Sequence, residues 1–388
     1  MRTSWKLAAI TVGGAAAAAL SVVPAGAATT QAGNTARAGN TVRAGNTAPV
    51  VFVQTDATSG NTVVAYERTA SGGLKEAGSY PTGGDGGIQV GSVVDHLSSE
   101  GSLAYDKNAG LLYAVNAGSD TVTVFAVRGD RLTRLQVISS GGQFPASVAF
   151  HGNQVYVLNA AGGGSVSGYL RAGGFLVPVP AWHRSLGLDP DQTPEFTSTP
   201  GQIGFTPDGT QLVVTTKNGG NTVDVFPVGL AGPSARPTVT SLPGTVPYGF
   251  TFDDYGHLAL VEAGPNAIAT FSIARDGELT QLGSVATGQA GTCWVTAADG
   301  TLYASNAGSG TVSVLHDDPA GGLTASATAA TGAGTVDAAA SGDGRYLYVQ
   351  TGGAGDVDAF RVGPDGALTE TGSVTVPGAV GGEGIAAS

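Results

Sequence analysis

Few side chains in this sequence could transfer a proton near neutral pH, since the chain holds only five histidines and one cysteine. We expect His96, Glu100 and Glu262 to act as the acid or base of any reaction, because imidazole and carboxylate groups can take a proton from attacking water. Groups of this kind could assist the attack of water on a carbonyl group. No spacing rule links the three residues, so only the fold can bring them together.

A second set of side chains could bind the ligand of such a site. Lys217 and Arg184 could polarise a carbonyl group or hold an anion. The other polar or aromatic residues that we expect to contact ligand are His183, Gln202, Trp294, Asn116, Asn159, Asn306 and Asp337. For the three asparagines a purely local role stays open, because asparagine commonly bonds the backbone of its own turn.

No sequence motif indicates a cofactor or a metal ion. Asp189, Asp191 and Glu195 offer oxygen ligands that calcium would accept, but their spacing matches no calcium loop, so solvated acids are the preferred interpretation. Cys293 could be a nucleophile only beside a base, and no motif supplies one. The P-loop, HExxH and GxSxG patterns are all missing from the sequence.

The elements that must position these residues come from an internal repeat. A pair of alternating strands joined by a short Gly/Asn/Ser turn occurs seven times; two of the copies read LLYAVNAGSDTVTVF from Leu111 and TLYASNAGSGTVSVL from Thr301. An apolar strand precedes most copies and a further strand follows most of them. Four short antiparallel strands at a period in the forties predict an all-β fold, a seven-bladed β-propeller.

The copy that begins at Val51 has no innermost strand before it. The chain ends in GEGIAAS, which resembles the innermost strands of other copies. We therefore expect the C-terminal strand to complete the first blade and close the ring, which leaves no long free edge. The predicted propeller covers residues 48–388.

Two connections between blades are longer than the others. Asn116 and Asn159 are 43 residues apart, but Thr55 and Asn116 are separated by 61, and Asn159 and Lys217 by 58. The extra residues fall in 83–101, the first insertion, and in 180–201, the second insertion. Both join a fourth strand to the next innermost strand, so both lie on one face, which we expect to be the binding face.

The N-terminal sequence indicates export. Residues 1–27 combine Arg2 and Lys6 with an apolar stretch and a small-residue cleavage site, as in a signal peptide, and the AGNT repeats within 28–47 are typical of a flexible linker. Removal of two cations changes the formal net charge from −12 to −14. This acidity disfavours nucleic acid and anionic membranes as partners, and we expect a secreted monomer that binds a small polar ligand.

The phrases LYAVNAGSDTVTVF, LYASNAGSGTVSVL and FTPDG resemble the lactonase-type seven-bladed propellers, which include 6-phosphogluconolactonases and carboxymuconate cyclases, and also the YVTN-repeat propellers. The resemblance implies a ligand site at the channel mouth. Enzymatic members carry HxH and GPRH-like segments. Here the corresponding stretches read Ser99-Glu100-Gly101, Pro145-Ala146-Ser147 and Pro200-Gly201-Gln202.

Three hypotheses therefore remain open. The first is a lactonase-like enzyme that acts on a lactone or sugar acid. The second is a non-catalytic secreted propeller that binds a glycan or a protein, which the missing HxH and GPRH segments favour. The third is a structural propeller at the cell surface, as the YVTN likeness implies.

Overall fold

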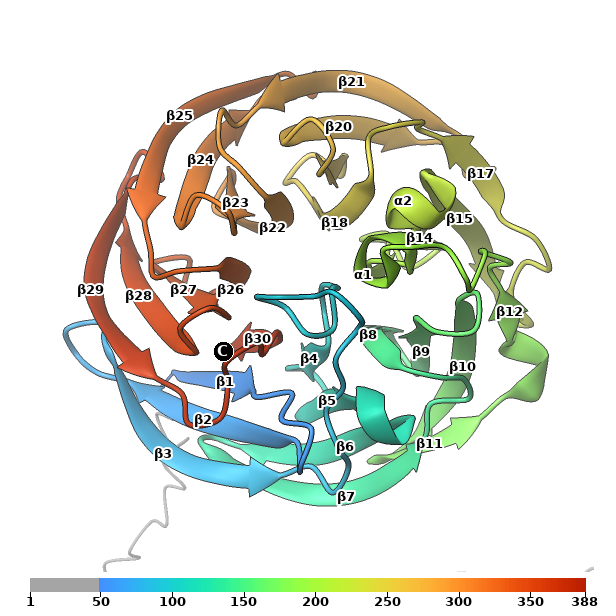
Figure 1. The fold of residues 1–388 in the computed structure, drawn as a ribbon, viewed down its shortest axis with the longest axis horizontal. Helices are drawn as coiled ribbons and strands as arrows, with labels where there is room; N and C mark the ends of the chain where they lie inside the picture. Colours follow the sequence, from blue (N-terminus) through green and yellow to red (C-terminus); the bar gives the residue numbers. More distant parts are fainter. Residues whose placement is uncertain (1–48) are drawn as a thin grey trace, which may run out of the picture. The chain divides into compact units, whose positions relative to one another are not determined.

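The computed structural model describes residues 49–388, in which seven antiparallel sheets are arranged around a central channel (Figure 1). The predicted all-β, seven-bladed propeller is confirmed. The predicted signal peptide and linker lie outside the described residues. Within the described part, no helix is long and apolar enough to cross a membrane.

Each blade begins with its innermost strand and ends at the outer rim. Blade 1 consists of β30 (Ile385–Ala387), β1 (Val50–Gln54), β2 (Thr62–Arg68) and β3 (Leu74–Pro81). Blade 2 consists of β4 (Leu103–Asp106), β5 (Leu111–Asn116), β6 (Thr121–Arg128) and β7 (Arg131–Ser139). Blade 3 consists of β8 (Pro145–His151), β9 (Gln154–Asn159), β10 (Ser165–Ala172), β11 (Phe175–Pro178) and β12 (Arg184–Ser185).

The remaining blades follow the same order. Blade 4 consists of β13 (Ile203–Phe205), β14 (Gln211–Thr215), β15 (Thr222–Gly229), β16 (Gly232–Pro233) and β17 (Thr238–Ser241). Blade 5 consists of β18 (Pro247–Phe252), β19 (Leu258–Glu262), β20 (Ala267–Ile273) and β21 (Leu279–Ala286). Blade 6 consists of β22 (Thr292–Ala298), β23 (Thr301–Asn306), β24 (Thr311–Asp317) and β25 (Leu323–Ala330). Blade 7 consists of β26 (Thr335–Ala340), β27 (Tyr346–Thr351), β28 (Asp356–Val362) and β29 (Leu368–Thr375).

The burial of each strand follows from its place in the blade. Second strands such as β5 and β23 are buried at every residue, because neighbouring blades cover both of their faces. Outer strands such as β3 and β25 are mostly exposed, since they form the rim. The core is therefore a set of apolar clusters between adjacent blades; one of them joins Tyr113 of blade 2 to Val157 of blade 3.

The ring closes as predicted. Residue Ile385 of β30 pairs with Val53 of β1, and Ala387 pairs with Val51. The Ser388 amide also donates a hydrogen bond to the Val50 carbonyl, at 2.9 Å. Blade 1 is thus built from both ends of the propeller sequence, and β1 keeps no free inner edge.

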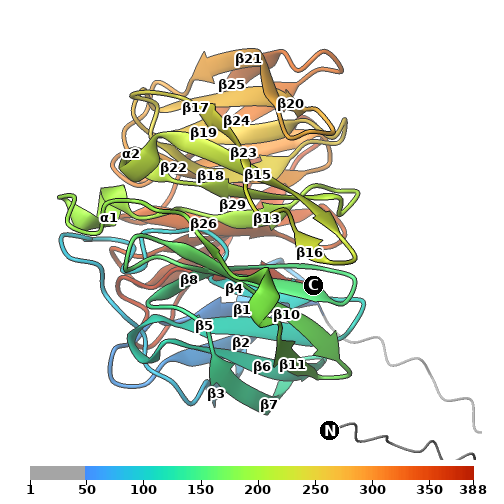
Figure 2. The same ribbon diagram turned by 90° about the vertical axis from the view of Figure 1, so that its right-hand side faces the viewer.

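Both insertions lie on one face, as Figure 2 shows for α1 (Glu195–Ser198) of the second insertion and the neighbouring α2 (Lys217–Gly220). The first insertion, drawn in teal near the centre of Figure 1, crosses the mouth of the channel. Its His96 amide donates to the Gly381 carbonyl at 2.7 Å, and the Trp294 side chain donates to the Ser99 carbonyl at 2.7 Å. The first insertion therefore covers the channel mouth, and it is called the strap below.

Candidate functional site

The two insertions meet and together form a cap over the channel mouth. The Ser98 hydroxyl of the first insertion donates to the Phe196 carbonyl of the second at 2.6 Å. The Val90 amide donates to the Glu195 carboxylate at 2.8 Å, and the Thr199 hydroxyl donates to Gln89 Oε1 at 2.8 Å. Three bonds along the contact fix the position of one insertion relative to the other.

Lys217, the first residue of α2, connects this cap to the propeller. Its ammonium group donates to the Ser98 carbonyl at 2.5 Å, to Ser98 Oγ at 3.1 Å and to the Phe196 carbonyl at 2.7 Å. All three protons of the ammonium group are therefore used. The side chain is fully buried, and this burial lowers the pKa of Lys217 to about 7, although the nearby Asp95 carboxylate opposes the shift.

Asp95 organises the turn of the first insertion. One carboxylate oxygen accepts the amides of Leu97 and Ser98, both at 2.8 Å. The other accepts the Ser99 amide at 2.8 Å and the Tyr248 hydroxyl at 3.2 Å. Burial raises the pKa of Asp95 to about 6, against the effect of these amides and of Lys217. Its hydrogen-bonding capacity is thus also filled by the protein itself.

A cavity of about 220 Å³ lies between the cap and blades 4 to 6. Tyr248 and Trp294 form one wall, with ring centroids 5.4 Å apart at an interplanar angle of 63°. Cys293, the single cysteine of the chain, is partly exposed in the wall, and burial raises the pKa of its thiol to about 12. The thiolate is therefore not formed at neutral pH, and Cys293 acts here as a small apolar surface.

Four further carboxyl groups are buried beneath the strap: Asp56, Glu100, Asp337 and Glu383. Asp56 accepts the Glu383 amide at 2.8 Å, and Glu383 accepts the Gly101 amide at 3.0 Å. Asp337 accepts the amides of Ala338 at 2.7 Å and Ile385 at 3.1 Å. The innermost strands and the strap therefore hold these acids through backbone amides.

Burial moves the ionisation of these four carboxyl groups to higher pH. Burial raises the pKa of Asp56 and of Asp337 to about 7. It raises the pKa of Glu100 and of Glu383 well above the usual range, with a further rise from the charge of Asp337. One oxygen of Glu100 and one of Glu383 are buried without a hydrogen-bond partner, which disfavours the ionised form of both groups.

The predicted site residues divide between the cavity and the channel. Lys217 and Trp294 line the cavity. Glu100 and Asp337 lie in the channel with the other buried acids. His96 is partly buried, with its ring against Gly381, and burial lowers its pKa. The structure thus brings Glu100 and Asp337 together but joins neither to the cavity.

The predicted asparagines are buried and mainly bond within their own blades. Asn116 donates to Thr121 Oγ1 at 3.1 Å and Thr123 Oγ1 at 2.9 Å, and Asn306 makes the equivalent bonds to Thr311 and Ser313. Asn159 bonds Ser140, Ser165 and Ser167 in the same manner. These contacts match the local role that was left open for them, and none of the three lines the cavity.

Two other predicted residues also lie outside the cavity. Gln202 accepts the Phe250 amide at 2.5 Å and so joins the innermost strands of blades 4 and 5. Glu262 ends β19, and burial raises the pKa of its carboxyl, but only its neighbour Ala263 reaches the cavity wall.

The structure corrects the expected position of His183 and Arg184, which do not stand over the channel. Arg184 begins β12, an outer strand of blade 3, and its guanidinium donates to carbonyls that include Ser234 at 2.7 Å and Ala181 at 2.8 Å. His183 is exposed beside Ser167, 3.3 Å from its hydroxyl. The second insertion begins with a 3-10 turn, Pro180–Trp182, after which β12 pairs with the part of the β10 edge that β11 leaves free.

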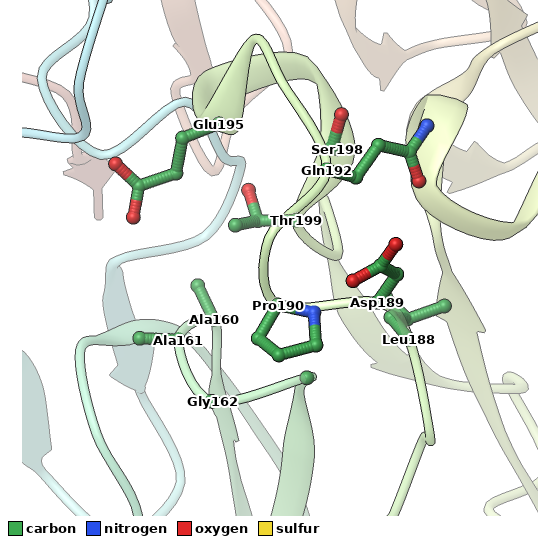
Figure 3. A pocket seen from close by; sticks show the side chains of 11 residues that line it. Ala160, Ala161, Gly162, Leu188, Asp189, Pro190, Gln192, Glu195, Ser198 and Thr199 are labelled. Carbon is green, nitrogen blue, oxygen red and sulfur yellow. The ribbon is translucent and has the colours of Figure 1, made fainter.

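Two of the three acids considered for calcium, Asp189 and Glu195, line a separate, very small hollow of about 30 Å³ (Figure 3). Asp189 and Glu195 point from opposite sides of this hollow, and Glu195 is bonded to the Val90 amide. Among the described residues, no three His, Cys, Asp or Glu side chains are arranged to hold a metal ion.

Sequence reasoning did not single out Asp95, Asp56 or Phe196. Asp95 and Phe196 lie within the insertions, where the repeat offers no equivalent position for comparison. Asp56 follows β1 in the sequence QTD, where most other copies carry alanine or glycine, and that difference was the available signal. Tyr248 and Glu383 were recognisable as residues that open innermost strands.

Fold and site together define a seven-bladed β-propeller with a capped, largely apolar cavity beside its channel mouth. The chain belongs to the lactonase family of seven-bladed β-propellers, whose family model matches residues 61–380.

Solved structures with the same fold include enzymes named for lactones. A putative 6-phosphogluconolactonase from Bacteroides fragilis is 20% identical, with a TM-score of 0.68 over 88% of this chain and 98% of that one. The periplasmic gluconolactonase of Pseudomonas aeruginosa is 20% identical, with a TM-score of 0.69 over 87% and 98%. Virginiamycin B lyase from Staphylococcus aureus is 16% identical, with a TM-score of 0.53 over 75% and 89%. No curated protein matches the chain significantly.

Proposed function

We propose that this propeller binds a small cyclic ester in the cavity beneath the cap. The single observation that carries the proposal is the cavity itself, which two insertions on one face build beside the channel mouth. Family membership supplies the chemical class of the ligand. A concave, mostly apolar pocket with few polar groups is the usual form of a small-molecule site.

Binding without turnover is the second candidate, and the hydrogen bonds of the site favour it. Hydrolysis needs a base that can reach a water molecule. Both charged groups of the cavity wall are already engaged, Lys217 with three acceptors and Asp95 with four donors. Burial raises the pKa of Glu100 and of Glu383 well above the usual range, which removes these two acids as bases at neutral pH. Asp56 and Asp337, with a pKa of about 7, do not line the cavity.

The proposal is tested by titrating the protein with a panel of lactones and recording heat of binding and thermal shift. We expect at least one lactone to give a heat of binding and to raise Tm. Ala307→Phe places a ring in the cavity wall and should abolish both effects. Ala320→Phe, at an exposed turn outside the cavity, is the matched control. If neither variant loses binding, the ligand binds at some other site.

Turnover is measured separately, as acid release from each bound lactone in a pH-stat. Acid release by the wild type that Ala307→Phe removes would establish a lactonase. Binding with no acid release would establish the non-catalytic alternative.

We also propose that the protein is exported, because residues 1–27 have the sequence pattern of a signal peptide. Expression of the full chain in a secreting bacterial host should yield a supernatant form that begins at Ala28. Retention of Met1 in a cell-associated product would contradict the proposal.

A further inference from the structure

The cavity differs from a sugar-lactone site in the chemistry of its lining. The side chains of Val93, Val94, Phe196, Val246, Tyr248 and Trp294 supply most of its wall. Among the described residues, no arginine or histidine lines it, and Lys217 is the single cation. The recognition surface is therefore aliphatic and aromatic.

A phosphate group would find no partner in this cavity. Phosphate is held in proteins by charge-assisted hydrogen bonds from arginine, lysine or clustered backbone amides. The ammonium protons of Lys217 already point to Ser98 and Phe196, and the Asp95 carboxylate on the same wall would repel an anion.

A polyhydroxylated ring is disfavoured for a related reason. Each hydroxyl group that enters the cavity gives up water and must find a new hydrogen bond, at a cost of about 1–3 kcal/mol when it finds none. The polar side chains of the wall bond to one another or to the cap; they are Ser92, Asp95, Ser98, Thr197, Lys217 and Tyr248. A sugar lactone would bring several hydroxyl groups and would leave them unpaired.

The rim of the cavity also favours an apolar ligand. Val93 lies at the rim with 80% of its surface exposed, although it is one of the lining residues. Covering an exposed valine with an apolar group removes apolar surface from water and is therefore favourable. The edge-to-face rings of Tyr248 and Trp294 provide the opposite wall, against which a flat ring can pack.

We infer that the ligand is an uncharged lactone with an aromatic or alkyl body, and that phosphorylated and polyhydroxylated sugar lactones are excluded. The inference rests on the proposed function, namely cyclic-ester binding in this cavity. It separates this chain from the related structures named for gluconolactones, whose names imply polar substrates.

The test compares three probes on the protein without its predicted signal peptide, residues 28–388. They are dihydrocoumarin, glucono-δ-lactone and 6-phosphogluconolactone, each titrated by calorimetry and by thermal shift. We expect dihydrocoumarin to bind at least tenfold more tightly than either sugar lactone. Tighter binding of a sugar lactone would overturn the inference while leaving the proposed function intact. No binding of any lactone would overturn both.

A pair of phenylalanine variants tests the location. Phe196→Ala removes a ring from the cavity wall but keeps the carbonyl that Lys217 bonds, and should weaken dihydrocoumarin binding about tenfold. Phe175→Ala removes an exposed ring on β11 and should change affinity less than twofold. Equal affinities for the two variants would show that the apolar wall does not hold the ligand, and would overturn the inference.

Discussion

Replacement of Glu383 by glutamine should make the stability of the propeller less dependent on pH. The carboxyl group is completely buried, and burial together with the charge of Asp337 raises its pKa well above the usual range. A carboxyl group whose folded pKa lies above its unfolded pKa stabilises the fold at low pH. This stabilisation is lost as pH rises towards the folded pKa.

The sign and size of the effect follow from proton counting. Between pH 5 and pH 7 the unfolded chain has released the Glu383 proton, whereas the folded protein retains it. The free energy of unfolding then falls by about 1.4 kcal/mol per pH unit for this one group, or roughly 2.5 kcal/mol over the interval. For 340 ordered residues the entropy of unfolding is about 0.7 kcal/mol per kelvin, so Tm should fall by about 3–4 °C from Glu383 alone.

Glutamine fits this position because it reproduces the protonated acid. Oε1 can keep the hydrogen bond from the Gly101 amide, and the new amide group takes the place of the unpartnered Oε2 beside Asp337. Wild-type Tm should therefore fall between pH 5 and pH 7, since Asp56 and Asp337 add to the effect. Glu383→Gln should show a fall that is smaller by about 3–4 °C.

Differential scanning calorimetry at half-unit pH steps measures this slope. The pH range of the measurement stays below 7. The pKa of Lys217 is lowered to about 7, so this residue makes the fold more stable as pH rises above that value. Glu370→Gln, on the exposed strand β29, is the matched control and should follow the wild type. A slope for Glu383→Gln that equals the wild-type slope would refute the argument, because it would mean that Glu383 is ionised in the fold.

The other predictions concern the cap and the ring. Lys217→Met should cost about 1–3 kcal/mol in urea unfolding and expose both insertions to protease, because the buried carbonyls of Ser98 and Phe196 lose their donor. Gly249→Ala should lower Tm clearly, since a methyl group there would lie 1.9 Å from a Glu100 oxygen, whereas Gly229→Ala, with nothing within 4 Å, should not. A chain that stops after Gly384 should lose β30, melt earlier and aggregate through the free edge of β1, which light scattering during a melt would detect.

The sequence was sufficient to predict the architecture because the strands of each blade mostly follow one another in the chain. Strand pairs such as β5 with β6 join neighbours in the chain, and their alternation repeats in every copy. Ring closure needed only the missing strand before Val51 and a matching C-terminus. The common face of the two insertions followed from where the extra residues fell in the repeat.

The site was harder to predict from the sequence because it depends on how the insertions fold. The bond from Lys217 to Ser98 joins residues 119 positions apart, and no periodicity encodes it. Lys217 and Trp294 were identifiable because they occupy repeat positions, and Lys217 breaks the pattern there. Asp95 could not be distinguished from a solvated loop acid until the backbone of Leu97 to Ser99 was seen to wrap around it.

The structure reverses the roles that the sequence suggests for the channel mouth. A ring of acids beside a lysine predicts a polar site, but the strap buries that ring, and burial raises the pKa of its carboxyl groups. The ammonium group of Lys217 holds the two insertions together, and its hydrogen bonds to Ser98 and Phe196 leave no proton for a ligand. What remains for recognition is the apolar surface of Tyr248, Trp294 and Phe196, which exists only because the polar groups have closed the cap above it. Ligand affinity should therefore depend on Lys217 and Asp95 through the integrity of the cap, and on the aromatic rings through direct contact.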